Sequence, residues 1–271
     1  MSFPLLLGLL AAIFLSPIKY GTPIFMFCSA LMIPLAVYEC AAMLDKAGIR
    51  TVPLAAAVFS LLTVLSCWNT EVRHVVLWLL MVAMIFLPWL FILFRRDFAV
   101  ERAFNSVGVI TLVSTPFIIL MAVYLFRHSV YSQRRLFYII CATKAMDTGG
   151  YIFGMLSNRL MRNGNHKLCP KVSPGKSWEG AVGGMLLSLA VGWGFWVWLG
   201  DMALWKYLLL SALLAAASIL GDLTESALKR RCGVKDSGSW IPGMGGALDV
   251  LDSFIYTGLV YLVFLTTLGA A

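Results

Sequence analysis

The sequence predicts an all-α polytopic membrane protein with about nine transmembrane helices. Two features of its composition support this fold class. Of its 271 residues, 61% are hydrophobic and only 13% are charged, whereas soluble domains average about 45–50% apolar and about 25% charged residues. The apolar residues also form runs close to the roughly 20 residues that a bilayer-crossing helix needs. A single transmembrane domain over residues 1–271 is expected, with apolar helices in 1–134 and a more polar, catalytic part in 135–271.

Each expected helix corresponds to one apolar run. Pro34, Pro88 and Pro116 lie inside such runs. Membrane helices tolerate proline where neighbouring groups satisfy the freed carbonyls, so kinks are expected there. The first run is short, but it lacks the basic region and clear cleavage site of a signal peptide, so a spanning or tilted helix is expected. The nine predicted helices are 3–18, 22–44, 51–67, 74–94, 105–127, 135–156, 178–199, 203–223 and 247–269.

The basic residues predict how the chain is oriented. The formal net charge is +8, and 14 of the 21 lysines and arginines lie in the second, fourth, sixth and eighth loops between the predicted helices. The positive-inside rule therefore places these loops and the N-terminus in the cytoplasm. Topology and contact with anionic membrane lipids account for the excess charge, and a bound polyanion such as a nucleotide is compatible with it. No nucleic-acid partner is expected.

The cysteines and histidines do not predict a metal site. The six cysteines include no CxxC pair, and the three histidines are scattered at segment ends and in loops. Zinc sites need Cys and His ligands at short, regular spacings. If a metal is bound, carboxylates are the better candidates.

Ionisable residues inside the predicted helices are few, and they are unevenly distributed between the two halves of the chain. In the first half, Glu39 is the main exception, and its carboxylate is expected to extend toward the membrane surface. In the helix 135–156, Lys144 and Asp147 are three residues apart, so they share a face and can pair. Such residues are costly in a membrane and point to function, although a purely structural ion pair remains the alternative.

The loop before the predicted helix 178–199 combines cations and hydroxyls. Lys171, Ser173, Lys176 and Ser177 lie in the segment KVSPGKSWEG, where Pro174–Gly175 predicts a turn. Donors at a helix N-terminus suit an anion. An ordinary basic cytoplasmic loop would look similar, and the segment is not a P-loop because GxxxxGK[ST] is absent.

The eighth predicted helix, 203–223, ends in a second polar stretch, GDLTESALKRR. Its Asp222, Glu225, Ser226 and Lys229 have the spacing i, i+3, i+4 and i+7, which places them on one helical stripe. A solvated helix face would show the same spacing. The stripe therefore predicts either a site at the membrane surface or an ordinary exposed face.

The segment VKDSGSWIPGMGGALDVLDS at 234–253 completes the polar set. Lys235 and Asp236 precede a glycine-rich stretch, which can bring backbone N–H groups close to phosphates. Asp249 and Asp252 then open the last predicted helix. Mg²⁺ prefers oxygen ligands and is usually held by one or two carboxylates plus substrate phosphates. A nucleoside triphosphate site with an amphiphilic acceptor is the expected chemistry.

These blocks resemble the bacterial phosphatidate cytidylyltransferases, also called CDP-diacylglycerol synthases. The resemblance rests on DTGGYIFG at 147–154, VSPGKSWEG at 172–180, GDLTESALKR at 221–230 and the segment 234–253. It implies transfer of CMP from CTP to phosphatidic acid, giving CDP-diacylglycerol and pyrophosphate. It also implies a homodimer in the bacterial cytoplasmic membrane, in contact with membrane lipids, and a site between the C-terminal helices on the cytoplasmic side.

The resemblance assigns roles to individual residues. Mg²⁺ is the expected cofactor, with K⁺ as a second candidate beside it. The metal ligands would be Asp222 and Asp249; the catalytic residues Glu225, Ser226, Lys229 and Asp236; and the substrate- or phosphate-binding residues Asp147, Lys171, Ser173, Lys176, Ser177, Arg230, Lys235 and Asp252.

Two residues depart from the family pattern. Met244 stands where the motif usually has His, and Val250 stands where it usually has Arg. A hydrogen-bond donor and a cation are therefore missing, although Arg230 or Arg231 could replace the cation. Two alternatives to the phosphatidate enzyme follow. One is a family member that acts on another lipid phosphate, and the other is a non-catalytic lipid-binding or assembly protein.

Overall fold

The computed structural model describes residues 18–67, 99–126, 130–161, 164–240 and 245–268. The predicted helices 3–18 and 74–94 therefore fall almost entirely outside the described residues. The chain divides into two compact units, one formed by 1–125 with 231–251 and the other by 126–230 with 252–271. In chain order, the elements are α2 (Ile18–Lys46), α3 (Pro53–Ser66), α5 (Ala99–Phe126), α6 (Val130–Leu160), β1 (Lys167–Cys169), β2 (Ser173–Ser177), α7 (Trp178–Leu199), α8 (Leu204–Arg231), α9 (Ala247–Leu251), the 3₁₀ helix η1 (Asp252–Phe254) and α10 (Thr257–Thr267).

The helices confirm an all-α polytopic membrane protein in its main features. Within the described residues, five helical stretches are long and apolar enough to cross a bilayer, and α3 is a shorter apolar helix. Lys144 and Asp147 in the middle of α6 lower its hydropathy, so this helix is not among the five. The five stretches are Thr22–Lys46, Glu101–Met121, Trp178–Leu199, Leu204–Arg231 and Ala247–Thr267.

The last predicted helix is not continuous. The segment expected as one helix over 247–269 is divided into α9, η1 and α10. Asp249 lies in α9 and Asp252 begins η1, so the two carboxylates do not belong to one regular α-helix. At the break, the Ser253 backbone N–H donates a hydrogen bond to the side chain of its neighbour Asp252.

The first unit contains α2, α3, α5 and α9. Helix α2 ends before Gly48, whose φ of +86° is readily available to glycine, and Asp45 accepts a hydrogen bond from the Thr51 backbone N–H. Helices α3 and α5 contact each other through the hydroxyls of Ser60 and Ser114, which are 2.8 Å apart. Such polar contacts join helices where surrounding lipid offers no hydrogen-bond partner.

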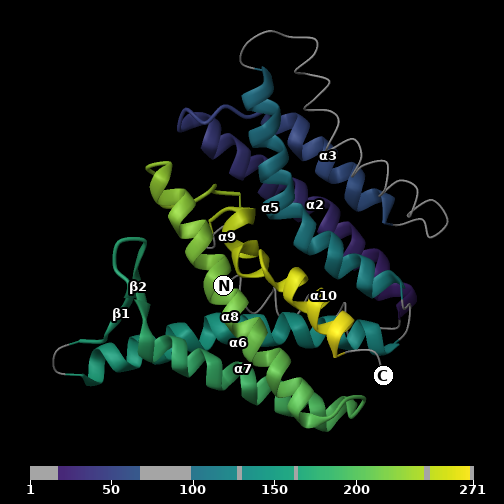
Figure 1. Cartoon of the computed structure of the whole chain (residues 1–271), viewed down its shortest axis with the longest axis vertical. Coiled ribbons are helices and arrows are strands. Elements are labelled where there is room, and N and C mark those ends of the chain that lie inside the picture. Colours follow the sequence, from purple (N-terminus) through teal and green to yellow (C-terminus); the bar gives the residue numbers. More distant parts are fainter. Residues whose placement is uncertain (1–17, 68–98, 127–129, 162–163, 241–244, 269–271) are drawn as a thin grey trace. The chain divides into compact units, whose positions relative to one another are not determined.

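The second unit is organised around the close packing of α6 on α7, which run side by side (Figure 1). Glycines on both helices make the approach close. A Cβ added to Gly149 would lie 2.7 Å from the Gly184 Cα, and one added to Gly180 would lie 2.6 Å from the Gly150 carbonyl. Small residues allow membrane helices to associate through their backbones. The glycines of the DTGGYIFG block therefore have a packing role.

Helix α8 packs on the same pair of helices. The Tyr138 hydroxyl donates to the Tyr207 carbonyl at 2.8 Å, and Ser188 donates to the Ser211 carbonyl at 3.2 Å. Tyr138 and Tyr207 are among the largest fully buried side chains. Asp201, just before α8, pairs with Arg135 at 2.6 Å. These contacts fix α8 relative to α6 and α7.

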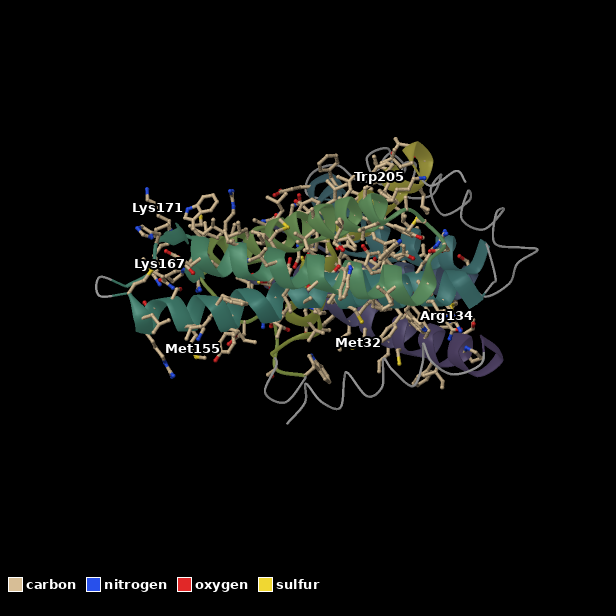
Figure 2. The ribbon with its side chains drawn as sticks, turned by 90° about the horizontal axis from the view of Figure 1, so that it is seen from below. Met32, Arg134, Met155, Lys167, Lys171 and Trp205 are labelled. Carbon is tan, nitrogen blue, oxygen red and sulfur yellow. The ribbon has the colours of Figure 1, made fainter. Side chains whose placement is uncertain are left out.

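A short β-hairpin connects α6 to α7. Strands β1 and β2 are antiparallel, with Lys167 opposite Ser177. The expected turn at Pro174–Gly175 was wrong, since both residues lie in β2. Within this unit, Lys167 and Lys171 lie at one end of the α6–α7 pair, whereas Arg134 and Trp205 lie toward the opposite end (Figure 2). The hairpin therefore places a group of lysines at one end of the helices.

Candidate active site

A cavity of about 310 Å³ lies in the second unit between the hairpin and helices α6, α7 and α8. Cavities of this size hold small ligands, and they combine apolar walls with a few placed polar groups. The cavity follows that pattern. Its lining residues are Met146, Asp147, Gly150, Tyr151, Leu168, Ser173, Gly175, Lys176, Ser177, Gly180, Ala181, Ile219 and Asp222.

The most prominent charge contact at the cavity joins β2 to α8. The Lys176 Nζ is 2.7 Å from the Asp222 Oδ2, and both side chains keep part of their surface exposed, 22% and 31% respectively. Asp222 also accepts from the Ser226 hydroxyl at 3.2 Å. A cation and a carboxylate thus stand together on an open cavity wall, where a phosphate or a metal ion could exchange for either partner.

Ser177 has a defined structural role at the same cavity. Its hydroxyl accepts a hydrogen bond from the Gly180 N–H at 3.1 Å and caps the N-terminus of α7. The His166 backbone N–H and ring lie within hydrogen-bonding distance of the Glu179 carboxylate, which attaches the hairpin to the first turn of α7. These contacts attach the hairpin to the start of α7.

Helix α8 carries three of the predicted catalytic residues, and they do not form a solvated stripe. Glu225 is only 1% exposed. It pairs with Lys229 at 2.7 Å, one turn along the helix. A buried, paired carboxylate contradicts the interpretation of this stripe as an ordinary exposed face.

Three carboxylates of the second unit converge. Ligand oxygens of Asp222, Glu225 and Asp252 lie within 4.8 Å of one another. Burial raises the cost of keeping several such groups charged together, and a bound cation would relieve that cost. Oxygen-only ligands suit a hard divalent cation such as Mg²⁺. This cluster can therefore hold a metal.

The pair predicted within α6 is present. The Lys144 Nζ lies 3.0 Å from the Asp147 Oδ2 and 2.6 Å from the Ser253 Oγ, and it stands over the ring of Phe254 at 5.0 Å. The other oxygen of Asp147 accepts from Ser218 of α8 at 2.6 Å. Because Asp147 also lines the cavity, this network connects the cavity wall to η1.

Asp249 belongs to the first unit and has its own set of donors. Its Oδ2 accepts from the Gly246 N–H at 2.7 Å, the Ser237 hydroxyl at 3.0 Å and the Ser237 N–H at 3.1 Å. Gly245, which precedes Gly246, has a φ of +87°, a conformation that favours glycine. Ser237 and Gly246 thus supply the donors for the carboxylate to which the sequence assigned metal binding.

The remaining predicted site residues lie at the surface. Lys171, Lys235 and Asp236 are exposed, as is Arg230, whose Nε lies 3.4 Å from the Val172 carbonyl. Val250 is buried, at 9% exposure. Met244 lies outside the described residues.

Two polar residues that were not assigned to the site lie close to its predicted members. Ser218 holds Asp147, and Glu39 contacts the segment that carries Asp249. The expectation that Glu39 extends to the membrane surface was wrong, because the side chain is buried at 4% exposure. A carboxylate inside an apolar run was the signal that could have identified it.

Fold and site together define a polytopic membrane protein with carboxylates and lysines beside a partly open cavity. The chain belongs to the cytidylyltransferase family, whose model matches residues 5–268. It is similar to proteins named phosphatidate cytidylyltransferase from several bacteria. The identity is 44% over 123 residues for the Haemophilus influenzae protein, 49% over 111 for that of Staphylococcus saprophyticus and 38% over 134 for that of Mycobacterium leprae.

These matches cover part of each protein. They span 44%, 41% and 49% of this chain and 41%, 40% and 41% of the respective relatives. The chain thus matches about two fifths of the length of these curated relatives.

Proposed function

We propose that this chain transfers the cytidylyl group of CTP to phosphatidic acid, with CDP-diacylglycerol and pyrophosphate as products. In this reaction a phosphate oxygen of the lipid attacks the α-phosphorus of CTP. The bond from that phosphorus to the bridging oxygen of the β-phosphate breaks, and pyrophosphate leaves. The observation that carries the proposal is the cavity where Lys176 and Asp222 meet, in a chain of the cytidylyltransferase family.

The cation of Lys176 suits the charge of this reaction. Its ammonium group lies on the cavity wall, with Ser173 among the neighbouring lining residues. Charged donors that are fixed before the reaction stabilise the charge that develops on transferring and leaving phosphates. Lys176 would bind a phosphate of one substrate, and the apolar part of the same cavity would exclude water.

The carboxylates fit a divalent cation, and Mg²⁺ is the proposed metal. Asp222, with Glu225 and Asp252 beside it, supplies the oxygen ligands that such an ion prefers. Asp249 is proposed as a further ligand, and K⁺ is proposed as a second ion. When bound, the metal would neutralise negative charge on the pyrophosphate portion of CTP.

The chain is an integral membrane protein. Its relatives are bacterial proteins, so the bacterial inner membrane is the proposed location. The sixth and eighth predicted loops, rich in lysine and arginine, are proposed to face the cytoplasm, where CTP is available. The acceptor would reach the site from the bilayer. A homodimer is also proposed, on the basis of the family resemblance.

A second candidate is transfer to a different lipid phosphate. It is favoured by Val250, a buried apolar residue at the motif position where Arg is usual. A cation missing from that position would change how an acceptor phosphate is held. The missing cation also favours a third candidate, a non-catalytic protein that binds the nucleotide without turnover.

The test is pyrophosphate release by the purified full-length protein in detergent, with CTP, Mg²⁺ and phosphatidic acid each omitted in turn. Release that requires all three, with CDP-diacylglycerol identified by mass spectrometry, is the expected result. If folded protein releases none, other lipid phosphates are tried as acceptors. Metal-dependent CTP binding without turnover on any of them would contradict the enzymatic proposal.

A further inference from the structure

Glu39 is a buried carboxylate in an otherwise apolar stretch of α2. Its exposure of 4% is far below that expected of a side chain reaching for the membrane surface. Acidic side chains are rarely buried unless hydrogen bonds or cations compensate the lost solvation. Its contacts therefore indicate what the residue does.

The partners of Glu39 lie about 200 residues further along the chain, in the same compact unit. The Glu39 Oε2 accepts from the Leu248 N–H at 3.0 Å and from the Ser237 hydroxyl at 3.2 Å. Leu248 lies in the first turn of α9, where backbone N–H groups have no partner within the helix. Glu39 thus supplies the acceptor for one of them and holds the start of α9 against α2.

Glycines allow the segment to approach this closely. A Cβ added to Gly238 would lie 2.3 Å from the Glu39 Oε1, and one added to Gly246 would lie 2.4 Å from the Glu39 Oε2. Both distances are shorter than any ordinary contact, so the backbone packs directly on the carboxylate. Gly238 and Gly246 therefore leave room for the Glu39 carboxylate.

The contact continues from Glu39 to Asp249. The Ser237 Oγ is 3.2 Å from the Glu39 Oε2 and 3.0 Å from the Asp249 Oδ2, and its single proton is donated to one of the two carboxylates at a time. Leu248, which Glu39 holds, is the immediate neighbour of Asp249 in the chain. Two routes, one through the Ser237 side chain and one through the α9 backbone, thus lead from α2 to the proposed metal ligand.

We propose that Glu39 is a positioning residue for Asp249, acting through Ser237 and the Leu248 N–H. The inference rests on the metal-binding role proposed for Asp249. Residues that orient metal ligands commonly change metal affinity or activity by about 10- to 100-fold when they are replaced. Helix α2 of the N-terminal half then helps to position Asp249, although it carries none of the motif blocks.

The experiment compares the full-length wild type with Glu39→Leu in detergent by two measurements. Amide hydrogen exchange reports whether α9 is held, and Mn²⁺ binding by electron paramagnetic resonance reports affinity for a stand-in divalent ion. Glu39→Leu should speed exchange at the Leu248 N–H roughly tenfold or more, because its carboxylate acceptor is lost. Exchange at the Gly246 N–H should also rise, because its acceptor Asp249 is no longer held in place. It should weaken Mn²⁺ binding by about 10- to 100-fold.

The matched control is Asp45→Leu on the same helix. Asp45 also accepts a backbone N–H, that of Thr51, but this contact closes the connection from α2 to α3. The control should leave exchange at α9 and Mn²⁺ affinity unchanged, even if the protein loses some stability. An equal effect of the two variants on Mn²⁺ affinity would overturn the proposal, because it would show a general consequence of damaging α2.

Ser237→Ala makes the test independent of whether Glu39→Leu folds. It removes only the hydroxyl between the two carboxylates and should weaken Mn²⁺ binding by roughly two- to tenfold. Unchanged Mn²⁺ affinity in this variant, or unchanged exchange and affinity in folded Glu39→Leu, refutes the positioning role. Asp249→Asn separates the two proposals: if it binds Mn²⁺ like the wild type, the metal role of Asp249 is wrong, while the exchange data still decide whether Glu39 holds α9.

Discussion

Lys176 and Lys171 look equivalent in the sequence, and replacing each with methionine tests the proposed cavity directly. They lie five residues apart in the same basic segment. In the structure, Lys176 lines the cavity and pairs with Asp222, whereas Lys171 is exposed between the strands of the hairpin (Figure 2). Methionine keeps most of the apolar stem and removes the charge, so the pair of variants isolates the ammonium group.

The magnitude follows from the geometry of Lys176. Its Nζ lies 2.7 Å from the Asp222 Oδ2, within reach of a strong, charge-assisted hydrogen bond. A hydrogen bond to a charged group contributes about 1.5–3 kcal/mol. Because each 1.36 kcal/mol is a factor of ten, Lys176→Met should lower kcat/KM by roughly 10- to 150-fold. Lys171→Met should stay within about twofold, since an exposed, screened charge contributes little.

The assay is pyrophosphate release with CTP and phosphatidic acid varied separately. A higher KM for only one of the two identifies the substrate whose phosphate Lys176 holds. A loss in kcat at unchanged KM would instead mean that the contact forms only in the transition state. If Lys171→Met is as damaging as Lys176→Met, charge in the hairpin acts from a distance and the cavity assignment is refuted.

Three further predictions concern packing and the metal site. Gly184→Ala should lower the Tm by several degrees in a thermal melt, because its Cβ would lie 2.5 Å from the Met146 carbonyl. The control is Gly194→Ala, whose Cβ meets nothing within 4 Å, so it should leave the Tm unchanged or raise it. Asp249→Asn should remove most activity yet keep the fold, since the amide oxygen still accepts from nearby N–H groups; normal turnover would disprove the ligand assignment. Val250→Arg should raise turnover if the missing cation is a handicap, and no gain would indicate compensation or another acceptor.

The sequence alone was sufficient to predict an all-α membrane protein and most of the helices in the described part. Long apolar runs leave few options, because a backbone in lipid must satisfy its own hydrogen bonds. The pairing of Lys144 with Asp147 also followed from spacing, since residues three apart meet on any α-helix. The sequence did not predict the hairpin, whose five-residue strand contains Pro and Gly, nor the break of the last helix between α9 and α10.

Tertiary structure decided which of the polar residues act together. Spacing could place Glu225 and Lys229 on one stripe, but only packing shows that Glu225 is buried. Spacing also could not distinguish Lys176 from Lys171, because the difference depends on how the hairpin meets α8. Glu39 shows the limit most clearly: its partners, Ser237 and Leu248, are about 200 residues away, and contacts at that separation are set by the packing of whole helices and leave no periodic signal in the sequence.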